Sequence, residues 1–205
     1  MSKGFWGVII AIVLIIGGVM YFSKDDSASK GTVTNHVMGT SKNSVTLTEY
    51  GDYQCPACGQ YYPIVKEVAD KYKDRITFQF RNLPLSQIHQ NAFAGARAAE
   101  AAAKQDKFWE MHDILYETQK SWSSSSNPKS YFDAYAKQLG LDTTKFDTDF
   151  ASSTVNDSIN ADIEAFNKTG ETKQTPSFFL NGKAIDPGAS VEEFAKLIDN
   201  ALANK

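Results

Sequence analysis

The sequence predicts an α/β fold that carries a helical insertion and is preceded by one N-terminal transmembrane helix. Three observations lead to this prediction. A charge-free apolar run occupies residues 5–22, a strand–helix–strand pattern covers residues 44–80, and a strand–turn–strand–helix pattern ends the chain. The long stretch between the last two patterns has mostly helical periodicity.

The apolar run at residues 5–22 contains no charged residue. About 18 apolar residues can cross the hydrocarbon layer as a helix, and Trp6 and Tyr21 stand near its ends, where aromatic rings favour the headgroup level. Lys3 keeps the N-terminus cytoplasmic by the positive-inside rule. The alternative is a cleaved signal peptide, but its apolar region is usually about 7–15 residues long, and Ser27–Ser29 is a poor cleavage site. We therefore expect an uncleaved single-pass anchor in the cell membrane, with the rest of the chain on the extracytoplasmic side.

The bulk composition is that of an ordinary globular protein, with 42% hydrophobic and 22% charged residues among 205. The formal net charge is −3, and the chain contains no basic cluster. This charge pattern argues against a nucleic-acid partner and against a patch for anionic lipids. We expect a monomer.

After residue 43 the pattern becomes strand, helix and strand. Alternation predicts a strand over Ser44–Tyr50, and Gly51–Gln54 reads as a turn. Apolar residues then recur at helical spacing over Pro56–Tyr72, and Arg75–Phe80 alternates again. This order is the opening half of a thioredoxin-type unit.

The second half begins with helices and returns to strands. Asn181-Gly182 is a strong hairpin signal between two short apolar runs. We expect helices at Asn91–Lys120, Tyr131–Leu139, Thr144–Phe150, Val155–Lys168 and Val191–Ala203, and strands at Ser177–Leu180 and Lys183–Ile185.

These patterns divide the chain into four parts. We expect a transmembrane signal-anchor at residues 1–23 and a flexible tether at residues 24–43, which are rich in Ser, Lys and Thr. Residues 44–86 and 171–205 would form the thioredoxin-like domain, and residues 87–170 the helical insertion.

The two cysteines, Cys55 and Cys58, form a C-x-x-C pair between the predicted turn and helix. Cys55 falls near the N-cap and Pro56 near the first helical position, where proline is favoured because its missing N–H has no partner there. The helix dipole and free backbone N–H groups favour a thiolate, so the pKa of Cys55 should be lowered. Cys58, carried inward beyond Ala57, should titrate higher. One exposed reactive sulfur and one buried resolving sulfur are what exchange through a mixed disulfide requires.

Structural readings of the pair fit less well. A zinc site needs about four ligands, yet the chain has no further cysteine, and His36, His89 and His112 have no zinc-finger spacing. A structural disulfide across so short a loop would remove little entropy from the unfolded chain. We expect neither a metal nor another cofactor.

Two further positions each leave two readings open. By strand alternation Glu49 shares a face with Leu47, so it is either a buried acid that is used or paired, or an edge residue that points to solvent. The Thr175-Pro176 bond either starts an edge strand or is cis; X–Pro bonds favour trans by roughly twenty to one, so the residues alone do not establish a cis bond.

Four segments together resemble the DsbA family of exported, often membrane-anchored, thioredoxin-fold oxidoreductases. The combination is specific because the segments occur in this order, with a helical insertion between the two thioredoxin halves. They are Leu47–Tyr50 before the Cys55–Cys58 motif, Arg81–Leu85, Lys107–Asp113 and Thr175–Gly182.

The resemblance implies roles for individual residues. Cys55 would be the attacking sulfur and Cys58 the resolving sulfur, and Pro176 would be a cis-proline that faces them. The backbone of Thr175 would hydrogen-bond an extended substrate segment, and Glu49 would be the buried acid that aids proton transfer at Cys58.

The chain departs from the family at one position. The best-known strong oxidase of the family has histidine between its cysteines where this chain has Ala57. A cation beside the thiolate would stabilise it, so we expect a moderate oxidant, with the pKa of Cys55 lowered by only about one to three units. His89 and His112 fall in matching stretches, and we interpret both as structural or surface residues.

The leading hypothesis is therefore a dithiol oxidase that donates its disulfide to unfolded, newly exported cysteine-containing proteins. The resemblance implies reoxidation by a quinone-linked membrane partner. One alternative is a disulfide reductase or isomerase that uses the same atoms. Another, of a different class, is a Cu(I) metallochaperone; copper carriers often add methionines, but Met1, Met20, Met38 and Met111 lie far from the motif in the sequence.

Overall fold

The computed structural model describes residues 31–39 and 45–204. The predicted membrane helix at residues 5–22 and most of the predicted tether lie outside these residues. Within the described residues, no helix is both long enough and apolar enough to span a bilayer.

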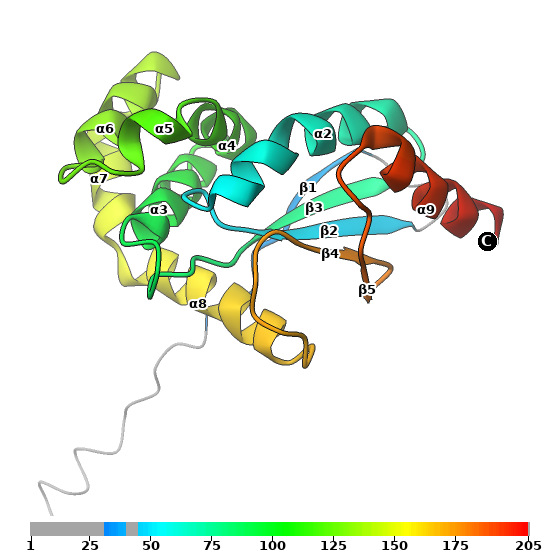
Figure 1. The fold of residues 1–205 in the computed structure, drawn as a ribbon. Coiled ribbons are helices and arrows are strands. Elements are labelled where there is room, and N and C mark those ends of the chain that lie inside the picture. The colour runs from blue at the N-terminus through cyan, green and yellow to red at the C-terminus, as the bar shows by residue number, and fades with distance from the viewer. Residues whose placement is uncertain (1–30, 40–44, 205) are drawn as a thin grey trace, which may run out of the picture. The chain divides into compact units, whose positions relative to one another are not determined.

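A five-stranded mixed sheet with the strand order β1-β3-β2-β4-β5 forms the centre of the fold (Figure 1). Strand β2 pairs in parallel with β3 and antiparallel with β4. Strand β1 adds to the outer edge of β3, and β5 to the outer edge of β4, both antiparallel. The strands are β1 (His36–Met38), β2 (Thr46–Gly51), β3 (Thr77–Asn82), β4 (Ser177–Leu180) and β5 (Lys183–Ile185).

Helices α2 (Pro56–Tyr72) and α9 (Val191–Ala203) cover one face of this sheet (Figure 1). Alternate strand residues point into the core beneath them, because successive side chains of a strand face opposite sides. The core on this face contains Leu47, Val65, Val68, Phe78, Phe178, Phe194 and Ile198.

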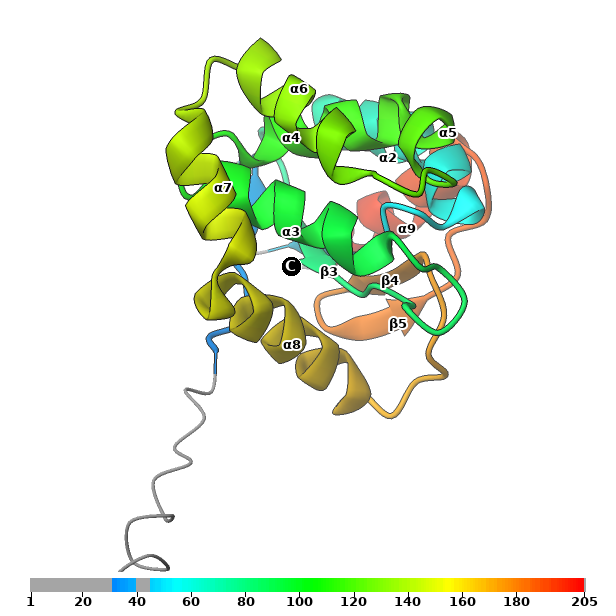
Figure 2. The ribbon, with the colours of Figure 1, turned by 90° about the vertical axis from the view of Figure 1, so that its left-hand side faces the viewer.

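The insertion packs around α3 (Ala92–Ala103), which Figure 2 shows at its centre. The alanines of this helix are mostly buried, and such small side chains let neighbouring helices approach closely. The core of the insertion includes Cys55 and Cys58, so it is continuous with the C-x-x-C motif. The remaining helices are α4 (Phe108–Glu117), α5 (Gln119–Trp122), α6 (Lys129–Gln138), α7 (Thr143–Ala151) and α8 (Ser153–Asn167).

The prediction of one helix over Asn91–Lys120 was wrong. The chain turns after α3, where Asp106 has a φ of 58° in the left-handed region that aspartate tolerates better than most residues. The N–H of Lys107 bonds to the carbonyl oxygen of Ala102 across this turn, at 3.0 Å. The segment is therefore divided into α3, α4 and α5.

Strand β1 lies within the predicted tether, so its residues are part of the sheet and not of a tether. This segment lacks a clear apolar pattern, and side-chain hydrogen bonds attach it to the rest of the fold. The N–H and hydroxyl of Thr34 donate to Asp162 at 2.8 and 2.6 Å, and His36 Nε2 lies 2.8 Å from Glu100 Oε1. A polar composition therefore concealed the strand.

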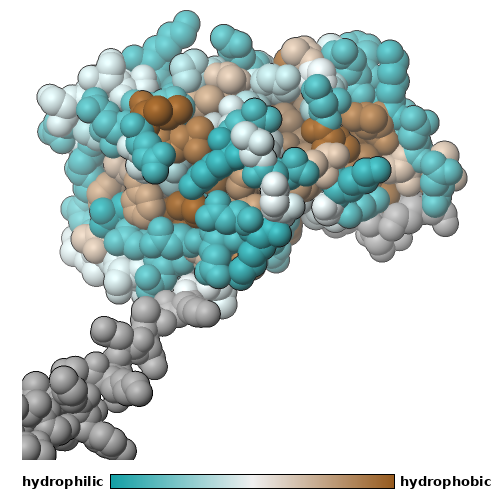
Figure 3. Space-filling view, turned by 60° about the horizontal axis from the view of Figure 1, so that its bottom comes forward, coloured by the Kyte–Doolittle hydropathy of each residue, from teal (hydrophilic) through white to brown (hydrophobic). Residues whose placement is uncertain are grey.

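The surface in Figure 3 is largely hydrophilic, with hydrophobic areas between the polar side chains. Among the described residues, the exposed large hydrophobic side chains are Val33, Val37 and Ile88. Val33 and Val37 belong to the segment around β1, and Ile88 to the loop after β3.

Candidate active site

Cys55 is the N-cap of α2 and Pro56 is its first residue, as predicted. Cys55 has extended backbone angles, with φ −65° and ψ 123°, and its carbonyl accepts the N–H of Gly59 at 3.1 Å. The first turn of α2 thus holds both cysteines, which are free thiols in this structure.

The sulfur of Cys55 faces the loop that leads into β4. Its Sγ donates to the backbone carbonyl oxygen of Thr175 at 3.4 Å. The Thr175–Pro176 peptide bond is cis, which decides between the two readings that the sequence left open. Cys55 retains 7% exposure and Cys58 none, so the two sulfurs differ less in exposure than we expected.

The two thiols differ strongly in acidity. A hydrogen bond from the Cys58 side chain is the main cause that lowers the pKa of Cys55 to about 5, and the Thr175 side chain and the backbone N–H groups of Ala57 and Cys58 add to it against the effect of burial. A free thiol titrates near 8.5, so the lowering has the direction expected from the sequence and arises without a cation at Ala57. Burial raises the pKa of Cys58 well above its ordinary value, and the neighbouring Cys55 and Glu49 raise it further.

Glu49 lies inside the molecule on the central strand β2. It is 2% exposed and lies on the same face of the strand as the buried Leu47, so the reading as a solvent-facing edge residue was wrong. Burial is the main cause that raises the pKa of Glu49 to about 8, and the negative charge of Cys55 contributes. At neutral pH this carboxyl therefore holds a proton and can exchange it.

Sequence reasoning missed Asp52, which is 1% exposed and organises the loop before Cys55. Its carboxylate accepts the N–H groups of Gln54 and Leu85 at 2.8 and 2.9 Å, and His89 Nδ1 lies 2.7 Å from it. The backbone carbonyl of Asp52 accepts the N–H of Cys55 at 3.1 Å. The sequence did contain one signal for this role: an aspartate three residues before Cys55, in a predicted turn, where aspartate commonly bonds to nearby backbone N–H groups. His89 therefore has a structural contact, in agreement with our interpretation.

The insertion adds a second support that the sequence did not indicate. Gln119 Nε2, on α5, donates to the carbonyl oxygens of Tyr53 and Cys55, both at 2.8 Å. The loop before Cys55 is thus held from α5 as well as from Asp52.

A cleft of about 660 Å³ adjoins the cis bond. Thr175 and Pro176 line it together with the aromatic side chains of Tyr61 and Phe178. The acidic side chains of Glu171 and Asp186 also line it.

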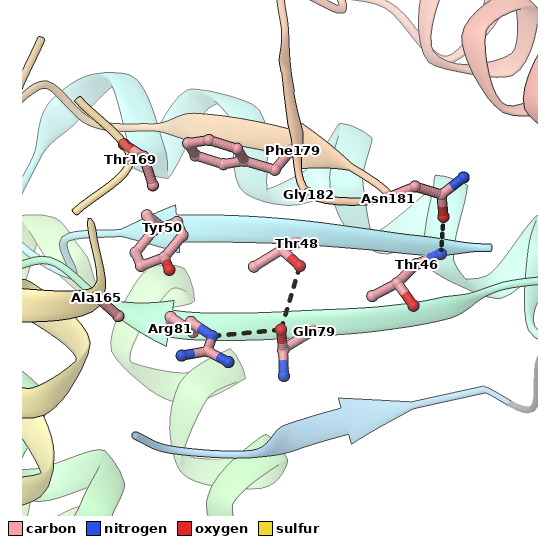
Figure 4. Close-up of a pocket in the computed structure, with 10 residues that line it drawn as sticks. All are labelled: Thr46, Thr48, Tyr50, Gln79, Arg81, Ala165, Thr169, Phe179, Asn181 and Gly182. Carbon is pink, nitrogen blue, oxygen red and sulfur yellow. Dashed lines mark hydrogen bonds between the residues drawn. The ribbon is translucent and has the colours of Figure 1, made fainter. Parts of the chain in front are cut away.

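A hollow of about 610 Å³ opens on the face of the sheet that α2 and α9 do not cover (Figure 4). Thr48 and Arg81 both donate to Gln79 Oε1 there, at 3.1 and 3.3 Å, and Tyr50 lies on the same face. No cysteine lines this hollow, so it is separate from the chemistry of the C-x-x-C motif.

Over residues 31–39 and 45–204, no group of three or more His, Cys, Asp or Glu side chains could hold a metal ion.

Comparisons with known proteins agree with the thioredoxin-like fold described above. The family model described as Thioredoxin matches residues 31–200. The crystal structure of BdbD from Bacillus subtilis (oxidised) superposes with a TM-score of 0.72 at 23% identity, covering 85% of this chain and 97% of that chain.

Two curated relatives match over different shares of their length. The probable disulfide bond formation protein D of Bacillus cereus is 27% identical over 205 residues, covering 94% of this chain and 93% of that protein. The Na(+)/H(+) antiporter NhaA 3 of Salinispora tropica is 34% identical over 170 residues, which are 83% of this chain but 25% of the antiporter. The chain therefore spans about a quarter of the length of that relative.

Proposed function

The chain belongs to the thioredoxin family, as a DsbA-like thiol–disulfide oxidoreductase, and we propose that it donates a Cys55–Cys58 disulfide to exported proteins. The observation that carries the proposed direction is the pKa of about 5 at Cys55. A thiolate exists there only when the pair is reduced, so its stabilisation favours the reduced pair and makes the disulfide an oxidant.

The proposed reaction begins with a substrate thiolate that attacks Cys55 Sγ of the disulfide. The Cys55–Cys58 bond breaks, a bond between Cys55 and the substrate forms, and Cys58 leaves with the electron pair and takes a proton from Glu49. A second substrate thiolate then attacks the substrate sulfur of the mixed disulfide. Cys55 leaves as its stabilised thiolate, and the substrate keeps the new disulfide.

The residues beside the sulfurs support this role. The carbonyl of Thr175 faces Cys55, and Thr175 and Pro176 line a cleft of about 660 Å³. We propose that an exported, unfolded polypeptide lies there and bonds to the backbone of Thr175, as an added strand would. A membrane redox partner would reoxidise the pair.

The reductase or isomerase alternative uses the same atoms in the other direction. It predicts a pair that is mostly reduced in the cell, whereas a donor is kept mostly oxidised. Nothing in the described part of the chain favours the copper-carrier alternative over exchange chemistry.

Trapping in intact cells tests the proposal. We expect Cys58→Ser to accumulate mixed disulfides with exported proteins through Cys55, because the resolving sulfur is missing, while Cys55→Ser, the matched control, accumulates few. Non-reducing gels count the adducts, and acid quench followed by alkylation reports the redox state of the wild-type pair. Equal trapping by both variants, or a wild-type pair that is mostly reduced, contradicts the proposal.

The place of the reaction is proposed as the extracytoplasmic side of the cell membrane. Protease added to spheroplasts should remove the C-terminus of the membrane-bound protein. Protection of the C-terminus, or a soluble chain that starts after the apolar run, contradicts this placement.

A further inference from the structure

A small cavity of about 130 Å³ lies behind the active-site helix, between α2 and α4. The buried side chains of Glu49 and His112 line it on the inside, and the exposed side chains of Lys66 and Asp70 line it as well. It therefore spans the distance from the proposed proton donor of Cys58 to the surface. One water occupies about 30 Å³ of liquid, so the cavity has room for a short chain of water molecules.

His112 has one ring nitrogen engaged and the other free. Nδ1 lies 3.1 Å from the Asp113 carboxylate, which only accepts, so Nδ1 carries the hydrogen and Nε2 presents a lone pair. Nε2 is buried and has no hydrogen-bonding partner among the described residues. A buried acceptor of this kind normally bonds to protein or to water.

Two tyrosines whose rings pack against the ring of His112 also carry unpartnered hydroxyls. The hydroxyls of Tyr53 and Tyr116 are buried and unpartnered within the described part of the chain. Their rings lie 5.7 and 5.1 Å from that of His112, centroid to centroid. Of these three groups, His112 lines the cavity, so a water there can bond to its unpartnered Nε2.

We propose that His112 is a positioning residue that holds a water chain in this cavity and passes protons between Glu49 and solvent. This inference rests on the proposed function. It assigns a task to a histidine of the insertion that we first interpreted as structural, and it explains why the insertion core closes directly on Cys58.

The relay acts when Cys58 resolves a mixed disulfide. Cys58 gives its proton to Glu49 and attacks Cys55 Sγ; the Cys55–Cys58 bond forms, and the partner sulfur leaves as a thiolate. Glu49 can take that proton only if it has already lost its own. We place this loss on the cavity water, which passes a proton to His112 Nε2 while the hydrogen on Nδ1 moves to Asp113 and then to solvent.

The charges around His112 keep its ring neutral between transfers. Burial is the main cause that lowers the pKa of His112, and Asp113 opposes it. Lys66 and Asp113 form an ion pair at 2.6 Å, so their charges largely offset one another. The titratable groups that face His112 are Glu49 on β2, Tyr53 in the loop, Tyr62 and Lys66 on α2, Asp113 and Tyr116 on α4, and His36 on β1.

The relay is needed only where Glu49 begins protonated, so the effect of losing His112 should appear at low pH and disappear at high pH. Glu49 has a pKa of about 8, so at pH 7 it must release a proton before resolution, whereas at pH 9 it is already ionised. The reduced full-length chain would be mixed with oxidised glutathione at both pH values and quenched with acid at timed intervals. Mass spectrometry then counts the mixed disulfide on Cys55 and the Cys55–Cys58 disulfide.

We expect His112→Gln to slow resolution about tenfold at pH 7, less than the roughly 10²–10⁴-fold of a direct general acid or base because His112 acts through water and Glu49, and to differ little from wild type at pH 9. His112→Ala should show the same defect and recover with added imidazole. His36→Gln, the matched control, should resolve at the wild-type rate, because that histidine bonds to Glu100. In a Glu49→Gln background, His112→Gln should have no further effect.

A folded His112→Gln chain that resolves at the wild-type rate at pH 7 overturns the inference. So does a defect of equal size at both pH values, or one that persists in the Glu49→Gln background, since either would mark a packing effect. If the wild-type chain forms the mixed disulfide and the His112→Gln variant resolves it equally fast, the inference fails but the proposed function is left intact. A wild-type chain that forms no mixed disulfide overturns the proposed function and this inference with it.

Discussion

The sulfur of Cys55 lies 3.4 Å from the backbone carbonyl oxygen of Thr175, so the same residue that we expect to hold the substrate also contacts the reactive atom. The hydroxyl of Thr175 is buried and has no hydrogen-bonding partner among the described residues. Its side chain is nevertheless one of the causes that lower the pKa of Cys55. Substrate binding and thiolate stability therefore depend on one residue.

The first prediction concerns that hydroxyl. Thr175→Val keeps the shape of the side chain and removes the group that stabilises the Cys55 thiolate. The hydroxyl is unpartnered beside the Cys55 thiol, and a hydrogen bond that it donates to the thiolate is worth about 1 kcal/mol, so we expect its removal to raise the pKa of Cys55 by about one unit and to make the pair less oxidising. Thiolate absorbance near 240 nm, followed against pH, measures the change.

Thr172→Val is the matched control, because Thr172 lines the same cleft but is exposed. It should leave the titration of Cys55 unchanged. An unaltered titration in Thr175→Val as well would show that the backbone of this loop, and not the hydroxyl, sets the acidity of Cys55.

The second prediction concerns the relative stability of the two redox forms. A thiol whose pKa is lowered on folding adds stability that is complete above the unfolded pKa of about 8.5 and is lost as pH falls through the folded pKa. With a folded pKa of about 5 at Cys55, the reduced form should gain on the order of 2–3 kcal/mol at pH 7 relative to pH 4. The oxidised form has no thiolate and should not show this gain.

Burial of Glu49 acts in both redox forms and cancels in the comparison to first order. The raised pKa of Cys58 matters only above about pH 8.5, outside the window tested. Urea midpoints of both forms at pH 4 and pH 7 measure the difference. An oxidised form that is clearly the more stable at pH 7 would favour the reductase alternative.

The sequence was sufficient for the elements with strong local patterns. The strands Ser177–Leu180 and Lys183–Ile185 and the helix Val191–Ala203 have the predicted bounds, because the hairpin turn and the amphipathic period are local signals. Strand β1 was not predictable in this way. Its support comes from Asp162 and Glu100, which are far from it in the sequence.

The active site shows the same division. The positions of Cys55 and Pro56 at the start of α2 follow from helix-capping rules, and the cis bond before Pro176 was expected from the family resemblance. The low pKa of Cys55 was predicted in direction, but its main cause is the Cys58 side chain and not the helix terminus alone. The contacts of Asp52 with Leu85 and His89, and those of His112 with distant rings, depend on tertiary packing, which no local pattern contains.

The third prediction tests the support that Asp52 gives to the loop before Cys55. Asp52→Ala would leave the N–H groups of Gln54 and Leu85 and the ring of His89 without their acceptor. A fully buried donor left unsatisfied costs about 1–3 kcal/mol; these three donors belong to part-buried residues, so we expect a total loss of about 3 kcal/mol in the free energy of unfolding. Urea denaturation measures it, with Asp74→Ala at an exposed position as the control. A loss under about 1 kcal/mol would mean that water replaces the carboxylate at little cost.

The last prediction separates the stability cost of Glu49 from its use. The carboxyl is 2% exposed, and burial raises its pKa to about 8, whereas an unfolded glutamate titrates near 4.3. A raised carboxyl pKa costs nothing below about pH 4.3, and its cost grows until pH reaches the folded pKa. Glu49→Gln removes that cost, so the variant should be more stable than wild type by about 3 kcal/mol at pH 7.

The same substitution should slow the formation of the Cys55–Cys58 disulfide from a mixed disulfide, because Cys58 then lacks its proton acceptor. Urea midpoints at pH 4 and pH 7 test the first half, since the gain in stability should vanish at pH 4. A gain of equal size at both pH values would come from packing of the amide and would contradict the ionisation argument. A variant that is more stable at pH 7 and slower in resolution would show that this buried acid is kept for proton transfer at the expense of stability.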